Sequence, residues 1–238
     1  MTISLIGTAS TDASSGTAVS LTHGLSIQSG DVIIATVNAN GSGNTVTDNN
    51  GSTAFTTDHY ADNPDSARYY VMHRVAGASE PSSYAFTLGS SGRWSIVVRQ
   101  YRGVDSSVWD VAPSADSLNT GTSLVTGLAV ADSVSIATSG ACGLVLMGDD
   151  FNPTTTTYSS IDNDYGNAAY EAGAQYQATA DKLNLSTGAT GDTTLTSSYK
   201  VAYAIYQVAL KPSAASVSYL PGVMRHHIIA PKGVILHG

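Results

Sequence analysis

The scarcity of Glu and Lys limits what this chain can fold into more than any other feature of its sequence. Across 238 residues, Glu occurs twice and Lys four times. These long charged residues are the usual ones on solvent-facing helix surfaces, so few segments here can form a stable exposed helix. Thr, Val, Tyr and Ile are instead mixed with Gly, Asn and Ser, which is typical of strands and tight turns. The composition predicts an all-β protein.

The overall composition excludes several classes of protein. With 42% apolar and 12% charged residues, the chain is expected to be ordered. A net charge of −8 argues against a nucleic-acid partner. We find no secretory signal at the start and no apolar run long enough for a transmembrane helix, so we expect no membrane partner and synthesis in a host cytoplasm. The single cysteine, Cys142, lies in an apolar run and is expected to be a buried hydrophobe.

Turn residues recur at short intervals and separate segments of strand-like pattern. Residues 32–37 are almost continuously apolar, which predicts a central strand covered on both faces. Residues 167–176 are compatible with a helix, but the surrounding glycines favour a strand. All seven prolines lie outside the predicted strand interiors. No period of about 20 to 50 residues is present, so an array of short repeats is not expected. Further strands are predicted at 2–7, 18–21, 53–60, 67–75, 84–88, 93–102, 133–138, 143–147 and 199–210.

About a dozen short strands in one span favour a single antiparallel β-sandwich, jelly-roll-like, with an immunoglobulin-like sandwich as the alternative. The sequence Lys211-Pro212-Ser213 ends a strong strand pattern and opens a stretch of small residues. We therefore predict a β-sandwich domain over residues 1–212. Residues 213–238 are predicted to be a C-terminal arm or hairpin used for docking.

The C-terminal segment differs in charge from the rest of the chain. Residues up to Asp192 carry six basic and 18 acidic side chains, whereas no acidic residue follows it. Apolar residues in the tail fit an extended arm that buries side chains on a partner, for example by adding a strand to a sheet edge. The alternative is a hairpin that turns at 231–233 and folds back on its own domain. The predicted partner-binding residues are Leu220, Val223, Met224, Arg225, Ile228, Ile229, Val234, Ile235 and Leu236.

Motifs that would indicate catalysis are missing from the sequence. We therefore expect no enzymatic activity, no cofactor and no metal. Asp149 and Asp150 are the candidate carboxylate pair if the protein hydrolyses glycosides. Asp162 and Asp164 are the candidate ligands if it binds calcium. Both pairs are better explained as solvated turn acids.

Histidines and tyrosines supply the remaining candidates. The isolated His23, His59 and His73 are interpreted as turn or surface residues, and adjacent His226 and His227 would point to opposite faces of a strand and not share an ion. Tyrosine rings can stack on sugars or form protein interfaces, so glycan binding stays open, although sheet-facing packing is the simpler interpretation. The tyrosines that gather in the middle of the chain are Tyr60, Tyr69, Tyr70, Tyr158, Tyr165, Tyr170 and Tyr176.

Four segments, in this order, resemble a β-sandwich domain of tailed-phage virion proteins and of bacterial surface proteins. They are Gly30–Ala35 (GDVIIA), Ala78–Thr87 (ASEPSSYAFT), Tyr101–Asp105 (YRGVD) and Val208–Pro212 (VALKP). The resemblance covers residues 17–212 and leaves the tail outside. It implies an accessory structural or adhesive module, with no catalytic residue to carry over.

The resemblance and the tail together favour a non-enzymatic virion protein, and within that class a capsid decoration (cement) protein on the capsid surface. Its expected partners are the major capsid protein or another virion protein, and sister subunits in a homo-oligomer, for which a trimer is our expectation. The alternatives are a phage tail protein and a carbohydrate-binding or adhesion module. A glycan hydrolase is the third hypothesis, after the virion protein and the carbohydrate-binding module.

Overall fold

The computed structural model describes residues 1–64, 66–123, 128–150, 158–161, 164–171, 175–197 and 201–214. All the tail residues predicted to bind a partner, as well as His226, His227 and Asp162, lie outside this part of the chain. In the described part, strands dominate and the only helices are the two single 3-10 turns Gly51–Thr53 and Ala115–Ser117. The prediction of an all-β protein with packed antiparallel sheets is confirmed.

The first half of the chain forms eight strands in two antiparallel sheets. A five-stranded sheet has the order β1-β8-β3-β6-β5, and we call it the first inner sheet. A three-stranded sheet has the order β2-β7-β4, and we call it the first outer sheet. The strands are β1 (Ser4–Ala13), β2 (Ala18–Thr22), β3 (Val32–Asn40), β4 (Val46–Asp48), β5 (Thr56–Asp62), β6 (Ala67–Val75), β7 (Ser83–Leu88) and β8 (Trp94–Arg102).

The second half forms another pair of large sheets. The second inner sheet has the order β10-β19-β13-β16-β15, with β9 also pairing to β19, and the second outer sheet has the order β11-β18-β14. A separate small pair joins β12 and β17. The strands are β9 (Val104–Val111), β10 (Leu118–Ser123), β11 (Leu128–Ala131), β12 (Ser135–Ile136), β13 (Ala141–Asp149), β14 (Tyr158–Ile161), β15 (Gly166–Glu171), β16 (Tyr176–Leu185), β17 (Gly188–Ala189), β18 (Thr193–Ser197) and β19 (Val201–Pro212).

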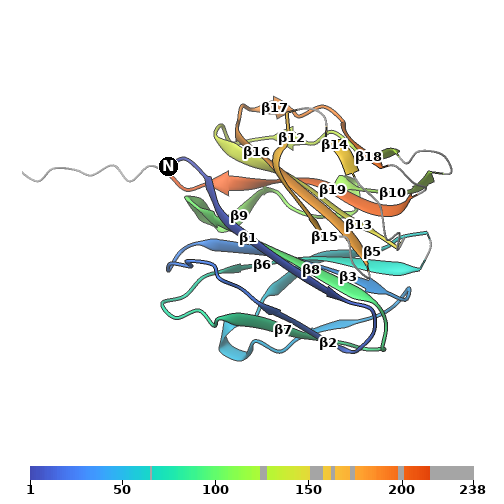
Figure 1. The fold of residues 1–238 in the computed structure, drawn as a ribbon. Helices are drawn as coiled ribbons and strands as arrows, with labels where there is room; N and C mark the ends of the chain where they lie inside the picture. The colour runs from blue at the N-terminus through green and yellow to red at the C-terminus, as the bar shows by residue number, and fades with distance from the viewer. Residues whose placement is uncertain are drawn as a thin grey trace, which may run out of the picture.

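The sheets stack in four layers. In Figure 1 the first half of the chain, blue to green, forms the two lower layers, and the second half, yellow to orange, forms the two upper ones. Three apolar cores lie between the layers. One lies between the two inner sheets, and each of the others lies between an inner sheet and its own outer sheet. The inner strands β3, β8 and β13 are therefore covered on both faces, and almost every residue in them is buried.

The two halves have the same topology. When β1 to β8 are matched in order with β10, β11, β13, β14, β15, β16, β18 and β19, both inner sheets and both outer sheets have identical strand orders. The same turn leads into the central strand of each inner sheet, since Gly30 (φ 87°) precedes β3 and Gly140 (φ 86°) precedes β13. The amide of Gly30 donates to Ala76 O at 2.9 Å, and the amide of Gly140 donates to Leu185 O at 2.8 Å. The chain thus contains two eight-stranded units, the first unit (4–102) and the second unit (118–212).

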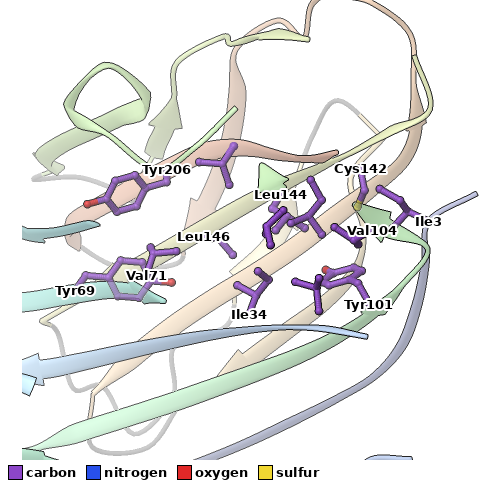
Figure 2. Close-up of a cluster of buried hydrophobic side chains, with 14 of the residues drawn as sticks. Ile3, Ile34, Tyr69, Val71, Tyr101, Val104, Cys142, Leu144, Leu146 and Tyr206 are labelled. Atoms are coloured by element: carbon purple, nitrogen blue, oxygen red, sulfur yellow. The ribbon is translucent and has the colours of Figure 1, made fainter. Parts of the chain in front are cut away.

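Strand register places individual residues of the two units in equivalent positions. Ala35 pairs with Met72 and Val98 in the first inner sheet, and Val145 pairs with Ala180 and Gln207 in the second. Ile34 and Leu144 are then equivalent, and both lie in the core between the inner sheets. Figure 2 shows this core, in which Ile34 and Val71 approach from one side and Leu144 and Leu146 from the other. The repeat is longer than the periods considered from sequence, so it does not conflict with the absence of short repeats.

The predicted strands match most of the observed ones. Residues 67–75 form β6 as predicted, and 32–37 form the doubly covered part of β3. The ambiguous segment 167–176 lies in β15 and at the start of β16, with no helix in its described part. Several strands were not predicted, because they are short or because their Ser, Thr, Asn, Asp and Ala content resembles that of loops. They are β4, β9, β10, β11, β14, β17, β18 and most of β16.

Candidate functional site on the β5 edge

Edge strand β5 carries an exposed aromatic ring among charged neighbours. Tyr60 is 50% exposed, and it is the only strongly exposed aromatic side chain in the part of the chain whose side chains are described. The guanidinium of Arg68 lies 4.7 Å from the centroid of the Tyr60 ring, a cation–π contact. Arg68 is held there by two hydrogen bonds of 2.7 Å that it donates to the Asp62 carboxylate. The Arg68 guanidinium lowers the pKa of Asp62, so this pair stays charged at neutral pH.

A small polar hollow adjoins this pair. The amide of Gly43 donates to Asp62 Oδ1 at 3.2 Å, which connects the Asp62–Arg68 pair to the loop between β3 and β4. That loop and the residues after β7 enclose about 250 Å³. Its lining residues are Ser42, Gly43, Asn44, Thr45, Gly89 and Ser90. We call Tyr60, Asp62, Arg68 and this hollow the β5 site. It offers a ring face, hydroxyl groups and backbone groups for contact, but no nucleophile paired with a base.

The other side of β5 is bound to the second half of the chain. His59 Nδ1 lies 2.8 Å from the Tyr206 hydroxyl of β19. Both carboxylate oxygens of Asp58 lie 2.8 Å from His73 Nδ1, and the Trp109 indole donates to Asp58 Oδ1 at 2.9 Å. His59 and His73 are thus structural and partly buried. The interpretation of them as simple surface histidines is corrected by contacts with β9 and β19, which lie far away in sequence.

The position of His59 predicts acid sensitivity. Burial lowers the pKa of His59 in the folded protein, so the unfolded chain binds the proton more readily. The contribution of the neutral His59 imidazole to the free energy of unfolding is therefore fully present above the ordinary pKa of about 6.5. This contribution is lost as the pH falls below that value. In urea unfolding at pH 7 and pH 5, we expect His59→Gln to lose less stability on acidification than the wild type. An equal or larger loss in the variant would contradict this role.

Asp149 and Asp150, the candidate pair for glycoside hydrolysis, are not arranged for catalysis. Asp149 is 1% exposed, and its Oδ1 accepts the Ala202 amide at 3.1 Å. Asp150 Oδ1 accepts from Asn40 at 3.0 Å and from Gln175 at 2.8 Å, and Arg93 lies 3.5 Å away. Both aspartates therefore bind neighbouring strands and loops. The interpretation as solvated turn acids is wrong for Asp149, because this residue ends the central strand β13 and is buried between β16 and β19.

The other candidate residues are placed as follows. Asp164 is strongly exposed and lies 3.6 Å from Lys182 Nζ, and the described part of the chain contains no cluster of three metal-ligating side chains. Cys142 is fully buried, as predicted, and burial raises the pKa of its thiol. Of the seven tyrosines in the middle of the chain, four are core residues and two have side chains outside the description. The four are Tyr69, Tyr70, Tyr165 and Tyr176.

Another hollow lies at the motif Glu80-Pro81. It encloses about 360 Å³ beside His23, whose ring stacks on Tyr84 at 4.7 Å. The Tyr84 hydroxyl donates to Glu80 Oε2 at 3.1 Å, and Arg74 Nη2 donates to Glu80 Oε1 at 2.7 Å. The side chains of Arg74 and Glu80 are almost fully buried. The Glu80-Pro81 motif, which is part of the resemblance, therefore anchors the loop between β6 and β7. This structural role accounts for the motif.

Sequence reasoning selected Tyr60 but missed Asp62, Arg68 and the hollow. The pattern Asp62-x5-Arg68 across a turn could have indicated a cross-strand ion pair. The hollow could not be predicted, because its two loops are more than 40 residues apart.

In the described part of the chain, no helix is long and apolar enough to span a membrane. Comparison with family models, with curated proteins and with solved structures gave no match for this chain.

Proposed function

We propose that this chain is a non-enzymatic structural protein of a tailed-phage particle, a capsid decoration protein that docks through its C-terminal segment. The observation that carries the proposal is that both eight-stranded units are complete at Pro212. Strand β19 is the equivalent of β8, the last strand of the first unit. The Ser213 amide then donates to Gly103 O at 2.9 Å, and the Met1 amino group donates to Ser213 O at 2.8 Å. We propose that residues 215–238 act outside the stack.

Charge and surface support the same function. The folded body is acidic, and the segment beyond it contains Arg225, Lys232 and apolar residues without a single acidic side chain. Such a segment can bury its apolar side chains on a shell protein or on a sister subunit. We further propose that the protein acts as a symmetric homo-oligomer, with the trimer as the expected form, on the outer capsid surface.

Deletion of residues 215–238 should abolish particle binding without unfolding the body. The experiment is co-expression with the major capsid protein of the same phage, followed by particle purification. We expect the truncated protein to keep its melting temperature within about 2 °C, because both units are complete without the tail. A full-length variant with Val234, Ile235 and Leu236 changed to Ser separates loss of apolar contacts from loss of length. Full occupancy of the truncated protein on particles would refute docking through the tail.

The β5 site supports a second function, binding of a glycan. An exposed tyrosine face beside an acid–arginine pair and a hollow lined with Ser, Thr and Asn is chemistry that can bind a sugar. Tyr60→Ala should then reduce binding on a glycan array at least tenfold, because the stacking surface is lost. Val75→Ala is the matched control, since Val75 is a 40% exposed apolar residue on the neighbouring strand β6. Equal binding by the two variants would exclude the β5 site as a sugar platform.

A further inference from the structure

The two inner sheets meet through faces that differ in chemistry. On one side, polar residues of β3 and β8 contact β16, and we call this the polar half of the interface. On the other side, β6 packs against β13 and β19 through side chains of one apolar core, and we call this the apolar half. Both halves are buried, so a polar group there is stabilised by a hydrogen-bond partner, and several of these partners come from the other unit.

Arg99 is the centre of the polar half. It is 1% exposed and donates to Thr179 Oγ1 at 3.0 Å and to Asp181 Oδ2 at 3.2 Å. Asp181 is also 1% exposed, and it accepts the Tyr101 hydroxyl at 3.1 Å and Asn167 Nδ2 at 2.7 Å. The guanidinium comes from the first unit and the carboxylate from the second. A buried cation and a buried anion therefore meet only when the two units face each other.

Amides complete the polar half. Thr36 Oγ1 donates to Gln177 Oε1 at 2.6 Å, and Gln177 Nε2 donates to Ser95 Oγ at 2.8 Å. Asn38 Nδ2 donates to the backbone carbonyls of Asp149 at 2.8 Å and Tyr176 at 2.7 Å. Each of these bonds also joins one unit to the other.

The apolar half lies on the opposite side of the same interface. The rings of Tyr69 and Tyr206 are stacked at 6.3 Å with an interplanar angle of 29°. Val71, Leu144 and Leu146 belong to the same core, as Figure 2 shows. Gly148 lies so close to Tyr69 that an added Cβ would be 2.6 Å from the ring Cγ.

At several equivalent positions that face the interface, the two units carry residues of different polarity or charge. The register that matches Ala35 with Val145 also matches Thr36 with Leu146 and Arg99 with Val208. It likewise matches Val71 with Thr179 and His73 with Asp181. The polar Thr36 and Arg99 of the first unit thus correspond to apolar residues in the second, and the apolar Val71 corresponds to the polar Thr179. His73 and Asp181 are both polar, but an imidazole cannot replace the carboxylate as the partner of Arg99.

We infer that the inner faces form a selective interaction surface: each fits the other unit and rejects a second copy of itself. If two first units paired in the same way, Arg99 would face Val71 and the His73 imidazole in place of Thr179 and the Asp181 carboxylate, and the nearby Asp58 carboxylate is already bonded to His73. If two second units paired, the Asp181 carboxylate would face Val208 without a cation. Burying an unpaired charge is strongly unfavourable, so the mixed pair is selected by rejection of both alternatives.

The test uses the full-length protein with a protease site inserted between the exposed residues Ser106 and Ser107. After cleavage of the folded protein, native mass spectrometry measures which pieces stay together. We expect only the complex of piece 1–106 with piece 107–238. Asp181→Asn should weaken this complex at least tenfold. Asp62→Asn, which also removes a carboxylate from an arginine pair but lies outside the interface, should leave it unchanged.

Tyr101→Phe is a milder substitution than Asp181→Asn, because it removes only the hydroxyl that donates to Asp181. It should weaken the complex at least threefold. Any of three results would overturn the inference. They are separation of the wild-type pieces, pairs of identical pieces in amounts comparable with mixed pairs, and equal effects of Asp181→Asn and Asp62→Asn.

Discussion

Arg99→Met is expected to lower the free energy of unfolding by about 3–5 kcal/mol, measured by urea denaturation at pH 7. The substitution keeps most of the side-chain volume but leaves Asp181 as a buried carboxylate without its cation. Asp181 keeps two hydrogen bonds, from Tyr101 and Asn167, but they do not replace a positive charge at 3.2 Å. The loss therefore comes mainly from the uncompensated anion, not from a smaller core.

A double substitution distinguishes these two causes. In Arg99→Met/Asp181→Leu both charges are gone, and replacing a buried ion pair with apolar residues is often nearly neutral. We expect the double variant to recover most of the stability lost in Arg99→Met. A loss below 1 kcal/mol in the single variant, or a double variant less stable than the single one, would contradict this account of the interface.

Gly148→Ala is expected to destabilise the protein by about 2–3 kcal/mol, through overpacking. Its new Cβ would lie 2.6 Å from Cγ and 3.0 Å from Cβ of Tyr69, with Cδ2 closer still. These atoms are at the base of a ring that is itself stacked on Tyr206, so the ring cannot move aside without disturbing the core. The inner sheets would have to separate locally.

Gly166→Ala is the matched control for this prediction. Gly166 also lies in a strand of the second inner sheet, but an added Cβ there would have no neighbour within 4 Å. We expect this variant to unfold within about 0.5 kcal/mol of the wild type, because surface changes away from special features have small effects. Similar destabilisation by the two alanines would show that backbone propensity, and not the contact with Tyr69, determines the cost.

The fold class follows from composition and local pattern, but the layering does not. Residues 32–37 were predicted to be covered on both faces because their apolar run is continuous, and the structure confirms it. Arg68 and Arg74 lie on the same face of β6 by the alternation of strand side chains, so its pattern predicts one polar face. Arg74 is nevertheless buried through Glu80, and His73 contacts Asp58. Partners of this kind allow a polar residue to enter a core, and local pattern cannot reveal them.

The duplication was hidden by the differences that make the interface selective. Arg99 aligns with Val208 and Thr36 with Leu146, so these equivalent inner positions share neither charge nor hydropathy. Similarity persists at the turns, where Ser29-Gly30 corresponds to Ser139-Gly140. A signal of a few residues is too weak to reveal two units, although strand order makes their equivalence plain.

The β5 site was only partly predictable for a similar reason. An aromatic residue in a predicted strand can be recognised from sequence, and Tyr60 was among the candidates. Its exposure depends on the end of the sheet at β5, and its charged neighbours come from the register of β5 with β6. The predicted docking residues of the tail lie outside the described part of the chain and stay a prediction.

Methyl–methyl nuclear Overhauser effects test most directly whether the two units are stacked through their inner sheets. We predict cross-peaks that join Ile34 and Val71 of the first unit to Leu144 and Leu146 of the second, since all four side chains belong to one core. Val19 and Leu21 should give cross-peaks only within the first unit, because they belong to the core beneath the first outer sheet. Cross-peaks confined to each half of the chain, with none between the two sets, would contradict the four-layer stack.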